Sequence, residues 1–265
     1  MKFRFQRKYL SLPYILFFLL FIIVPIFLIV FYAFTDKVTG AFSFNNFIKF
    51  ISDSTNINVL IISLVFGILN TVFCLLIGYP VAYFLADKKI NKSAIMVTLF
   101  VMPMWINFVI RTGATRDLLN WLNISGGTYP ELATLIGLVY NYLPFTILPL
   151  YTTMSKMDRS QIEASKDLGA NGLQTFIKVI IPLTMPGIVS AATMVFMPTI
   201  SSYVISDILS EYNVVLFGSY IDLYFNQNDW NFGSFMALIM LLLILISVFI
   251  SRKFSQDDDG KESIW

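Results

Sequence analysis

The chain has 265 residues, of which 57% are apolar and only 13% are charged, and its formal net charge is +2. This composition excludes an ordinary soluble globular domain, because such domains carry about 25% charged residues. The sequence contains no histidine and a single cysteine, Cys74. Imidazole chemistry, an internal disulfide and a thiolate metal cluster are therefore excluded. No phosphate-binding loop of the GxxxxGK(S/T) kind occurs, so the chain has no Walker motif of its own.

The sequence begins with a short basic segment, residues 1–11, followed by an apolar stretch at residues 12–34. A cleavable signal peptide is the rival interpretation. This stretch is longer than a signal-peptide core and lacks a small-x-small cleavage site, which favours an uncleaved membrane anchor.

Five further stretches are long and apolar enough to cross a hydrocarbon core of about 30 Å. They lie at residues 59–86, 94–113, 132–154, 187–206 and 232–250. The sequence thus predicts an all-α polytopic membrane protein, with six transmembrane helices within residues 12–250 and a C-terminal tail at residues 251–265.

Basic residues are distributed unevenly between the two sides of the predicted membrane domain. Fourteen of the 18 Lys and Arg lie at the two ends of the chain, between the second and third spans, or between the fourth and fifth. Because Lys and Arg are enriched in cytoplasmic segments, we expect a multi-pass protein of the cell membrane. Both termini and the loop at residues 155–186 are predicted to lie in the cytoplasm.

The opposite face is predicted to be acidic. Its last loop, residues 207–231, has four carboxylates and no Lys or Arg. Such a charge distribution would concentrate cations at an outer vestibule. The orientation rule alone also keeps basic residues out of external loops, so the asymmetry is compatible with both explanations.

The loop between the fourth and fifth spans contains two helix-start signals. The hydroxyl of Ser160 can accept from the backbone amide of Glu163 while the Glu163 side chain reaches back, which is a capping box. We expect a short helix here that ends at Gly169, since glycine adopts positive φ without strain. A second, weaker capping box at Asn171–Gln174 predicts another short helix, which ends near Pro182. Two short helices that meet at a glycine form a compact docking surface.

This loop resembles the EAA loop of ABC-importer permeases, in which Glu-Ala-Ala is followed after three residues by Gly and after nine more by Ile-x-Leu-Pro. The chain has Glu163-Ala164-Ser165, then Gly169 at the expected offset, then Val179–Pro182 where the motif should end. Three positions depart from the family pattern. They are Ser165, a small residue for a small one, and Val179 and Ile181, each an aliphatic residue for another.

The resemblance implies a type I ABC-importer (MetI-like) permease fold for essentially the whole chain. It also implies that the EAA loop (residues 155–186) forms a coupling helix that sits in a groove of a separate ATP-binding subunit. The residues expected to couple to that subunit are Glu163, Ala164, Ser165, Asp167, Gly169 and Ala170.

The family further implies a set of partners for this chain. These are two copies of the ATPase, a second homologous permease, an extracytoplasmic substrate-binding protein and the lipid bilayer. The chain itself is not expected to be an enzyme, to hold a cofactor or metal, or to bind nucleic acid.

Three further segments resemble the permeases of spermidine/putrescine importers, at residues 103–112, 196–207 and 228–233. A small cationic polyamine needs carboxylates for its ammonium groups and aromatic faces for cation–π contacts. The candidate substrate-path residues in these segments are Trp105, Tyr203, Asp207, Asp229 and Trp230. The alternative is that the aromatic residues form an interfacial belt and that the carboxylates end membrane helices without a ligand.

Arg111 and Arg116 lie near the outer end of the third predicted span. Because a guanidinium would repel a cationic substrate, we expect both to be surface arginines at a helix end. Pairing with an external carboxylate and contact with the binding protein are the alternatives.

Polyamine import is the preferred function. The alternatives are import of ferric iron, a sugar or an organophosphate by a related permease, and, less favoured, transport by a self-sufficient secondary transporter. Secondary transporters often place ionisable residues within the membrane, whereas no predicted span here has a charged residue in its middle.

Overall fold

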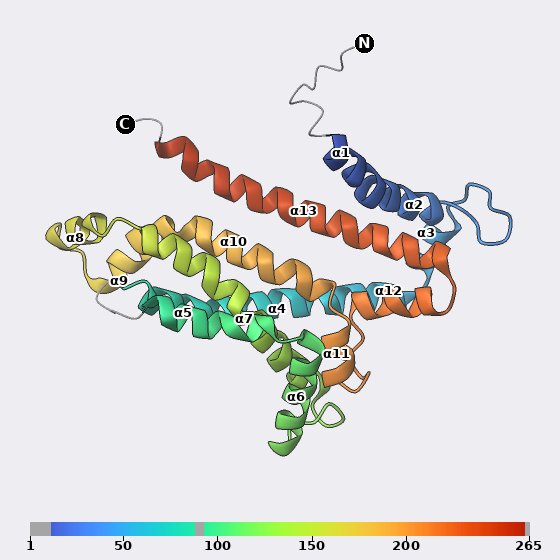
Figure 1. Cartoon of the computed structure of the whole chain (residues 1–265), viewed down its shortest axis with the longest axis horizontal. Coiled ribbons are helices and arrows are strands. Elements are labelled where there is room, and N and C mark those ends of the chain that lie inside the picture. Colours follow the sequence, from blue (N-terminus) through green and yellow to red (C-terminus); the bar gives the residue numbers. More distant parts are fainter. Residues whose placement is uncertain (1–11, 88–92, 263–265) are drawn as a thin grey trace, which may run out of the picture. The chain divides into compact units, whose positions relative to one another are not determined.

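The computed structural model describes residues 12–87 and 93–262, which form helices joined by loops (Figure 1). Over those ranges no β-strand forms, and a single backbone bridge pairs Thr35 with Phe42. The predicted all-α class is therefore confirmed. The predicted basic segment at residues 1–11 and the lysines at 88, 89 and 92 lie outside the described residues.

In chain order, the elements are α1 (Leu12–Phe18), the π-helical turn η2 (Leu19–Ile23), α2 (Val24–Ala33), α3 (Asn45–Ser52), α4 (Ser54–Leu85), α5 (Ser93–Val101), the 3₁₀ turn η3 (Met102–Trp105), α6 (Phe108–Trp121), α7 (Pro130–Lys156), α8 (Ser160–Asp167), α9 (Gly172–Thr175), the π-helical turn η4 (Phe176–Ile180), α10 (Ile181–Ile200), α11 (Val204–Leu209), α12 (Phe217–Asn226) and α13 (Trp230–Glu262).

Within the described residues, five helical stretches are long and apolar enough to cross a membrane. They are Pro13–Ala33, Ser54–Leu85, Pro130–Lys156, Gly172–Ile200 and Trp230–Lys253. The bent pair Ile95–Trp105 and Phe108–Trp121 makes a sixth when it is counted as one span. Each of the six predicted spans therefore has a helical counterpart.

The chain divides into two compact units. The smaller contains the residues up to Ile57 together with Ile221–Leu243. The larger contains Asn58–Tyr220 together with the residues from Ile244 onward.

In the larger unit, α7 and α10 lie side by side (Figure 1). Gly187 of α10 permits this close approach, because a Cβ there would lie 2.7 Å from Oγ1 of Thr153 on α7. Next to this contact, apolar side chains from α4, α5, α7 and α10 form a buried cluster that includes Leu85, Leu150 and Ala191. Because lipid is as apolar as these side chains, van der Waals packing and not removal from water holds such helices together.

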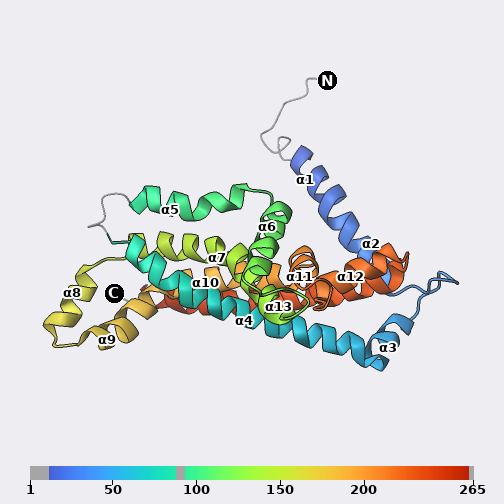
Figure 2. The same cartoon turned by 90° about the horizontal axis from the view of Figure 1, so that it is seen from below.

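The third predicted span, residues 94–113, is broken shortly after Pro103, a residue type that commonly kinks membrane helices. Its first half ends at Trp105, and α6 begins at Phe108 at an angle of 97° to that half (Figure 2). The new start has a local cause, because the side-chain oxygen of Asn107 accepts from the backbone amide of Val109 at 2.9 Å and caps α6. Apolar composition predicts that a segment lies in the membrane, but it does not predict where a side-chain cap starts a new helix.

The first predicted capping box of the EAA loop does not form. Instead, Ser160 donates its hydroxyl and its backbone amide to the carboxylate of Asp158, at 2.7 and 3.0 Å. The amide of Glu163 donates to the carbonyl of Arg159 at 3.1 Å. The prediction fails because a charged acceptor two residues earlier engages Ser160 more strongly than a backbone amide can.

The glycine turn and the second capping box are confirmed. Gly169 has φ of +83°. The Asn171 side chain accepts from the amide of Gln174 at 2.9 Å, and the Gln174 side chain accepts from the amide of Asn171 at 3.1 Å. The helix that follows does not end near Pro182, contrary to expectation. The turn η4 leads directly into α10, so that Pro182 falls in the first turn of α10, where its missing amide costs little.

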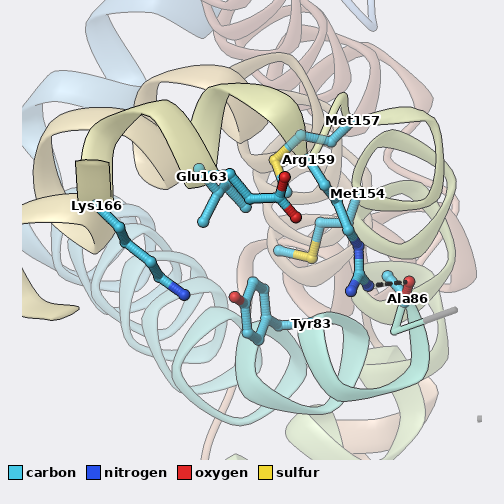
Figure 3. Close-up of a pocket in the computed structure, with 8 residues that line it drawn as sticks. Tyr83, Ala86, Met154, Met157, Arg159, Glu163 and Lys166 are labelled. Atoms are coloured by element: carbon cyan, nitrogen blue, oxygen red, sulfur yellow. Dashed lines mark hydrogen bonds between the residues drawn. The ribbon is translucent and has the colours of Figure 1, made fainter. Parts of the chain in front are cut away.

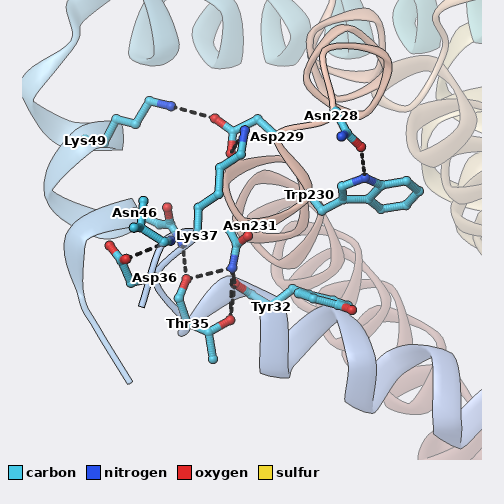
Figure 4. Close-up of polar contacts among 11 residues, drawn as sticks. Tyr32, Thr35, Asp36, Lys37, Asn46, Lys49, Asn228, Asp229, Trp230 and Asn231 are labelled. Carbon is cyan, nitrogen blue, oxygen red and sulfur yellow. Dashed lines mark hydrogen bonds and ion pairs between the residues drawn. The ribbon is translucent and has the colours of Figure 1, made fainter. Parts of the chain in front are cut away.

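The smaller unit is organised around Phe235 of α13. Its ring contacts the rings of Phe34, Phe47 and Phe50, at centroid distances of 6.5, 6.3 and 6.0 Å. The side-chain amide of Asn231 donates to the carbonyl and the hydroxyl of Thr35, at 2.8 and 2.9 Å, and so fixes the turn after α2 to the start of α13 (Figure 4).

Candidate functional site

The EAA loop presents an exposed surface at one end of α7 and α10 (Figure 1, Figure 2). Leu168 and Leu173, on either side of the Gly169 turn, are 89% and 68% exposed. Of the predicted coupling residues, Ser165 and Ala170 are half-buried, and the others, Glu163, Ala164, Asp167 and Gly169, are exposed. Two large apolar side chains exposed at one turn are the kind of feature that a partner protein covers.

The predicted coupling residues do not form one cluster, because they lie on two faces of the loop. Ala164, Ser165 and Ala170 line a groove of about 570 Å³, together with Leu168 and residues of η4 and α10. The Ser165 and Thr175 hydroxyls are 3.1 Å apart and join α8 to α9. Residues of both short helices, α8 and α9, therefore line the groove.

Glu163 lies on the other face, in a pocket of about 220 Å³ between α8 and the end of α4 (Figure 3). Tyr83, Met154 and Lys166 are among the other residues that line this pocket. Asp167 lines neither hollow. Of the two roles predicted for Glu163, the capping role is excluded by the hydrogen bonds of Ser160.

Arg159 connects the EAA loop to the membrane helices. Its guanidinium donates to the Asp87 carboxylate at 2.9 Å. It also donates to the carbonyl of Ala86 at 3.2 Å (Figure 3). Both side chains of the ion pair are about two-fifths exposed, at 40% and 39%. The pair therefore positions α8 against the end of α4 but contributes only modestly to stability.

Trp105 lies at the break in the third span and is 79% exposed. It lines a cavity of about 470 Å³ together with Phe108 of α6, Tyr142 and Phe145 of α7, and Ile205 of α11. This cavity is rich in aromatic faces, to which organic cations bind.

Arg111 lies in the wall of the same cavity, and the expectation that it is a surface arginine is wrong. It is only 7% exposed. Its guanidinium donates to the Asn141 side chain at 2.8 Å, to the Asn141 carbonyl at 3.4 Å and to the Pro103 carbonyl at 2.9 Å. These bonds tie α6 and η3 to α7 across the break. Within the described part of the chain, no ion pair joins Arg111 to a carboxylate.

Arg116 behaves as expected for an exposed arginine at a helix surface. It pairs with its neighbour Asp117 at 3.2 Å.

Asp207 and Tyr203 lie together at the start of α11, but they do not line the cavity that contains Trp105. The Asp207 carboxylate accepts from the Ser219 hydroxyl at 2.8 Å, and the Asp207 amide donates to the carbonyl of Tyr203 at 3.0 Å. The Tyr203 side chain is 44% exposed. The structure thus places these two candidates on one turn and Trp105 on a separate surface.

Asp229 and Trp230 belong to the smaller unit (Figure 4). Asp229 directly precedes α13, and Trp230 is the first residue of that helix. The Asp229 carboxylate pairs with Lys49 at 3.1 Å and lies 4.0 Å from the ammonium of Lys37. The indole of Trp230 donates to the Asn228 side chain, and its ring lies 5.3 Å from that of Phe225. Asp229, one of the four carboxylates of the acidic last loop, is therefore neutralised by Lys49 of α3 and by Lys37 of the turn before it.

Another carboxylate between the first two spans is engaged within its own turn. Asp36 accepts from the backbone amides of Val38 and Thr39, both at 2.9 Å, and these bonds lower the pKa of its carboxyl group below the ordinary value. Hydrogen bonds to the ionised form have this effect.

Sequence reasoning did not predict the structural roles of two cations, Arg111 and Lys49, which hold neighbouring segments together. Arg111 has a signal in the sequence, because it is the one charged residue in the run from Phe108 to Ala114. Lys49 has a weaker one, since it lies in a short apolar segment that precedes the second span. Neither signal identifies the partner of the cation.

Comparison with known proteins places the chain in a family. Residues 68–257 match the family described as "Binding-protein-dependent transport system inner membrane component". The spermidine/putrescine transport system permease protein PotB of Escherichia coli K12 is 34% identical over 228 residues, which cover 79% of this chain and 82% of the relative. The protein of the same name from Haemophilus influenzae is 36% identical over 195 residues, which cover 68% of each chain.

A solved structure supports the same fold. A chain of a bacterial ABC transporter involved in the import of the acidic polysaccharide alginate superposes with a TM-score of 0.70 and covers 93% of this chain and 94% of its own length. The two are only 16% identical, so this likeness concerns the fold alone. The chain belongs to the binding-protein-dependent transport system inner membrane components, and it is a PotB-like type I ABC-importer permease with several membrane-spanning helices.

Proposed function

We propose that this chain is the permease subunit of an ATP-driven importer of polyamines such as spermidine and putrescine. The observation that carries the proposal is its similarity to PotB over four-fifths of the chain, at 34% identity. The fold alone would not decide the substrate, because a protein of the same fold serves the import of acidic alginate. The carboxylates Asp207 and Asp229 and the aromatic side chains of Tyr203 and Trp230 would supply the chemistry that a polyamine needs.

The proposal includes a division of labour between subunits. The chain would pair with a second, similar permease, two copies of an ATPase and an extracytoplasmic binding protein that delivers the substrate. ATP hydrolysis would reside in the ATPase subunits, and the chain itself would catalyse no bond chemistry. The family description, which names binding-protein-dependent transport, supports the part assigned to the binding protein.

Within this assembly, the EAA loop would contact the ATPase. The exposed Leu168 and Leu173 and the groove beside Ala164 and Ala170 offer apolar surface and space for a partner. Closure of the ATPases around ATP would then move α8, and Arg159 would transmit part of that movement to the end of α4. The substrate would enter the outward-open cavity, and hydrolysis would return it to the inward-open state.

The proposed orientation places both termini and the EAA loop in the cytoplasm. The excess of Lys and Arg on that side supports it. Trp105, Tyr203, Asp207, Asp229 and Trp230 would then lie toward the external face and on the substrate path.

The proposed substrate is tested by uptake of labelled spermidine into cells that lack this gene, with and without complementation. Excess putrescine, maltose and ferric citrate serve as competitors. We expect complementation to restore uptake and only putrescine to reduce it. Unchanged uptake on complementation would contradict polyamine import and leave import of another solute, such as a sugar or ferric iron, as the alternative.

A further inference from the structure

The ammonium of Lys49 lies beside one carboxylate and two aromatic rings, a group of side chains called the ammonium pocket below. Its Nζ is 3.1 Å from the carboxylate of Asp229. It is also 4.0 Å from the centroid of the Phe232 ring and 5.1 Å from that of Tyr224. A carboxylate combined with aromatic faces is the environment that selects an organic ammonium group.

The residues around this ammonium hold one another in place without Lys49. The Asp229 amide donates to the carbonyl of Tyr224 at 2.9 Å, and the Gly233 amide donates to the carbonyl of Asp229 at 2.9 Å. The rings of Tyr224 and Phe232 meet edge to face at 4.6 Å. Tyr224, Asp229 and Phe232 come from α12, α13 and the turn between them, whereas Lys49 enters from α3. Removal of the lysine side chain would therefore leave Tyr224, Asp229 and Phe232 in the same arrangement.

Lys49 is held weakly enough to be displaced. Its side chain is 48% exposed and that of Asp229 is 22% exposed. Ion pairs this accessible to water contribute about 0.2–1 kcal/mol, and a cation–π contact at an exposed site contributes about 0.5–1 kcal/mol. The ring of Phe232 is fully buried with Lys49 over it, so a second ammonium can reach that ring only when Lys49 leaves.

We propose that Tyr224, Asp229 and Phe232 form a binding site for one ammonium group of the transported ligand, and that Lys49 is its resident intramolecular competitor. The inference rests on the proposed function, because only a ligand with an alkylammonium group competes for such a site. It assigns Lys49 a role in specificity. A ligand must offer an ammonium that binds better than the lysine, which a neutral sugar or an anion cannot do.

Equilibrium binding of labelled spermidine to the purified complex of permeases and ATPase, without the binding protein, tests this assignment. Lys49→Met should tighten binding about threefold, because it removes a competitor of the strength of an exposed ion pair. Asp229→Asn should weaken binding, and Lys49→Met should improve binding less in the Asp229→Asn background than in wild type. Lys49→Arg should bind like wild type, because a cation still occupies the ammonium pocket.

The matched control is Lys37→Met. It removes the same charge 4.0 Å from the same carboxylate, while Lys49, the residue that faces the two rings, stays in place. Its effect should be smaller than that of Lys49→Met.

Binding by Lys49→Met that equals or falls below wild type, in a complex that elutes intact, would overturn the inference. The inference would also be overturned if the wild-type complex imported spermidine in cells but did not bind it after purification. A wild-type protein that neither binds nor imports spermidine would overturn the proposed function itself.

Discussion

The EAA loop and the broken third span, both in the larger unit, reach their shapes by different means. The turn of the EAA loop is determined by neighbours in sequence, through the positive φ of Gly169 and the reciprocal bonds of Asn171 and Gln174. The break in the third span is held by Arg111, which reaches Pro103 eight residues earlier and Asn141 thirty residues later. An exposed turn can be specified locally, whereas a bend in a membrane helix frees polar backbone groups that side chains or a neighbouring helix must satisfy.

The largest effect is expected from the residue that holds the bend. Arg111→Met would leave the side-chain oxygen of Asn141 without its buried donor and the Pro103 carbonyl with the Ile106 amide alone, and such losses cost roughly 1–3 kcal/mol. We expect the free energy of unfolding of the purified permease to fall by about 3 kcal/mol and substrate uptake to be nearly lost. Thermal unfolding in detergent and uptake in cells measure the two effects.

Arg116→Met is the matched control for that variant. It removes the same charge from the same helix, but Arg116 is exposed and pairs with its neighbour Asp117, so the change should stay within about 0.5 kcal/mol. Equal stability of the two variants would mean that Arg111 does not hold the break.

The second effect concerns the glycine turn of the EAA loop. Gly169→Asp puts a side chain into the left-handed region, at a cost below the about 1–2 kcal/mol of most residues because Asp tolerates this region better, and it adds a charge at the exposed turn. We expect about tenfold slower uptake, with ATP hydrolysis uncoupled from transport and with normal membrane insertion.

Gly172→Asp adds the same charge three residues away, at a glycine that has no positive φ and has open space around it. Uptake by this variant should stay close to wild type. If both variants transported equally well, the backbone at Gly169 would have no part in coupling.

Of the two capping boxes predicted in the EAA loop, the structure contains only the second. Variants of the two capping residues test this difference. Asn171→Ala removes a complete capping box and should destabilise α9 locally by about 1 kcal/mol. Ser160→Ala removes only an exposed bond to Asp158 and should cost less than about 0.5 kcal/mol. Hydrogen exchange of the two helices measures both effects. Greater loss of protection in Ser160→Ala would restore the sequence-based expectation of a first capping box.

The smallest effect is expected from the ion pair between the EAA loop and the end of α4. In a double-mutant cycle of Arg159→Gln and Asp87→Asn, the coupling free energy should be about 0.5 kcal/mol, because both side chains are partly exposed. Salt should weaken the coupling. Additive effects of the two variants would mean that the pair does not join α8 to α4.

The number and place of the spans could be predicted because apolar runs of sufficient length are explicit in the sequence. Gly169 and Asn171 could be predicted because their geometry depends on nearby residues. The side chains that hold the break after Trp105 could not, since Asn141, which binds Arg111, lies on another helix.

The candidate ligand residues show the same limit. The sequence pointed to Asp229 as a carboxylate on the substrate path. It gave no sign that Lys49 forms an ion pair with this carboxylate. Residue types could be predicted from the chemistry of a polyamine. Their partners depend on which segments the fold brings together, and no local pattern encodes that.

The most direct test of the account is the energy source of spermidine uptake in proteoliposomes that contain this chain with its partner permease and ATPase. Uptake and ATP hydrolysis would be measured in the same vesicles, with the binding protein present. The account predicts that spermidine accumulates only with hydrolysable ATP, and that Gly169→Asp accumulates it about tenfold more slowly while hydrolysis continues. Accumulation without ATP, or unchanged accumulation by Gly169→Asp, would contradict an ATP-driven permease coupled through the EAA loop.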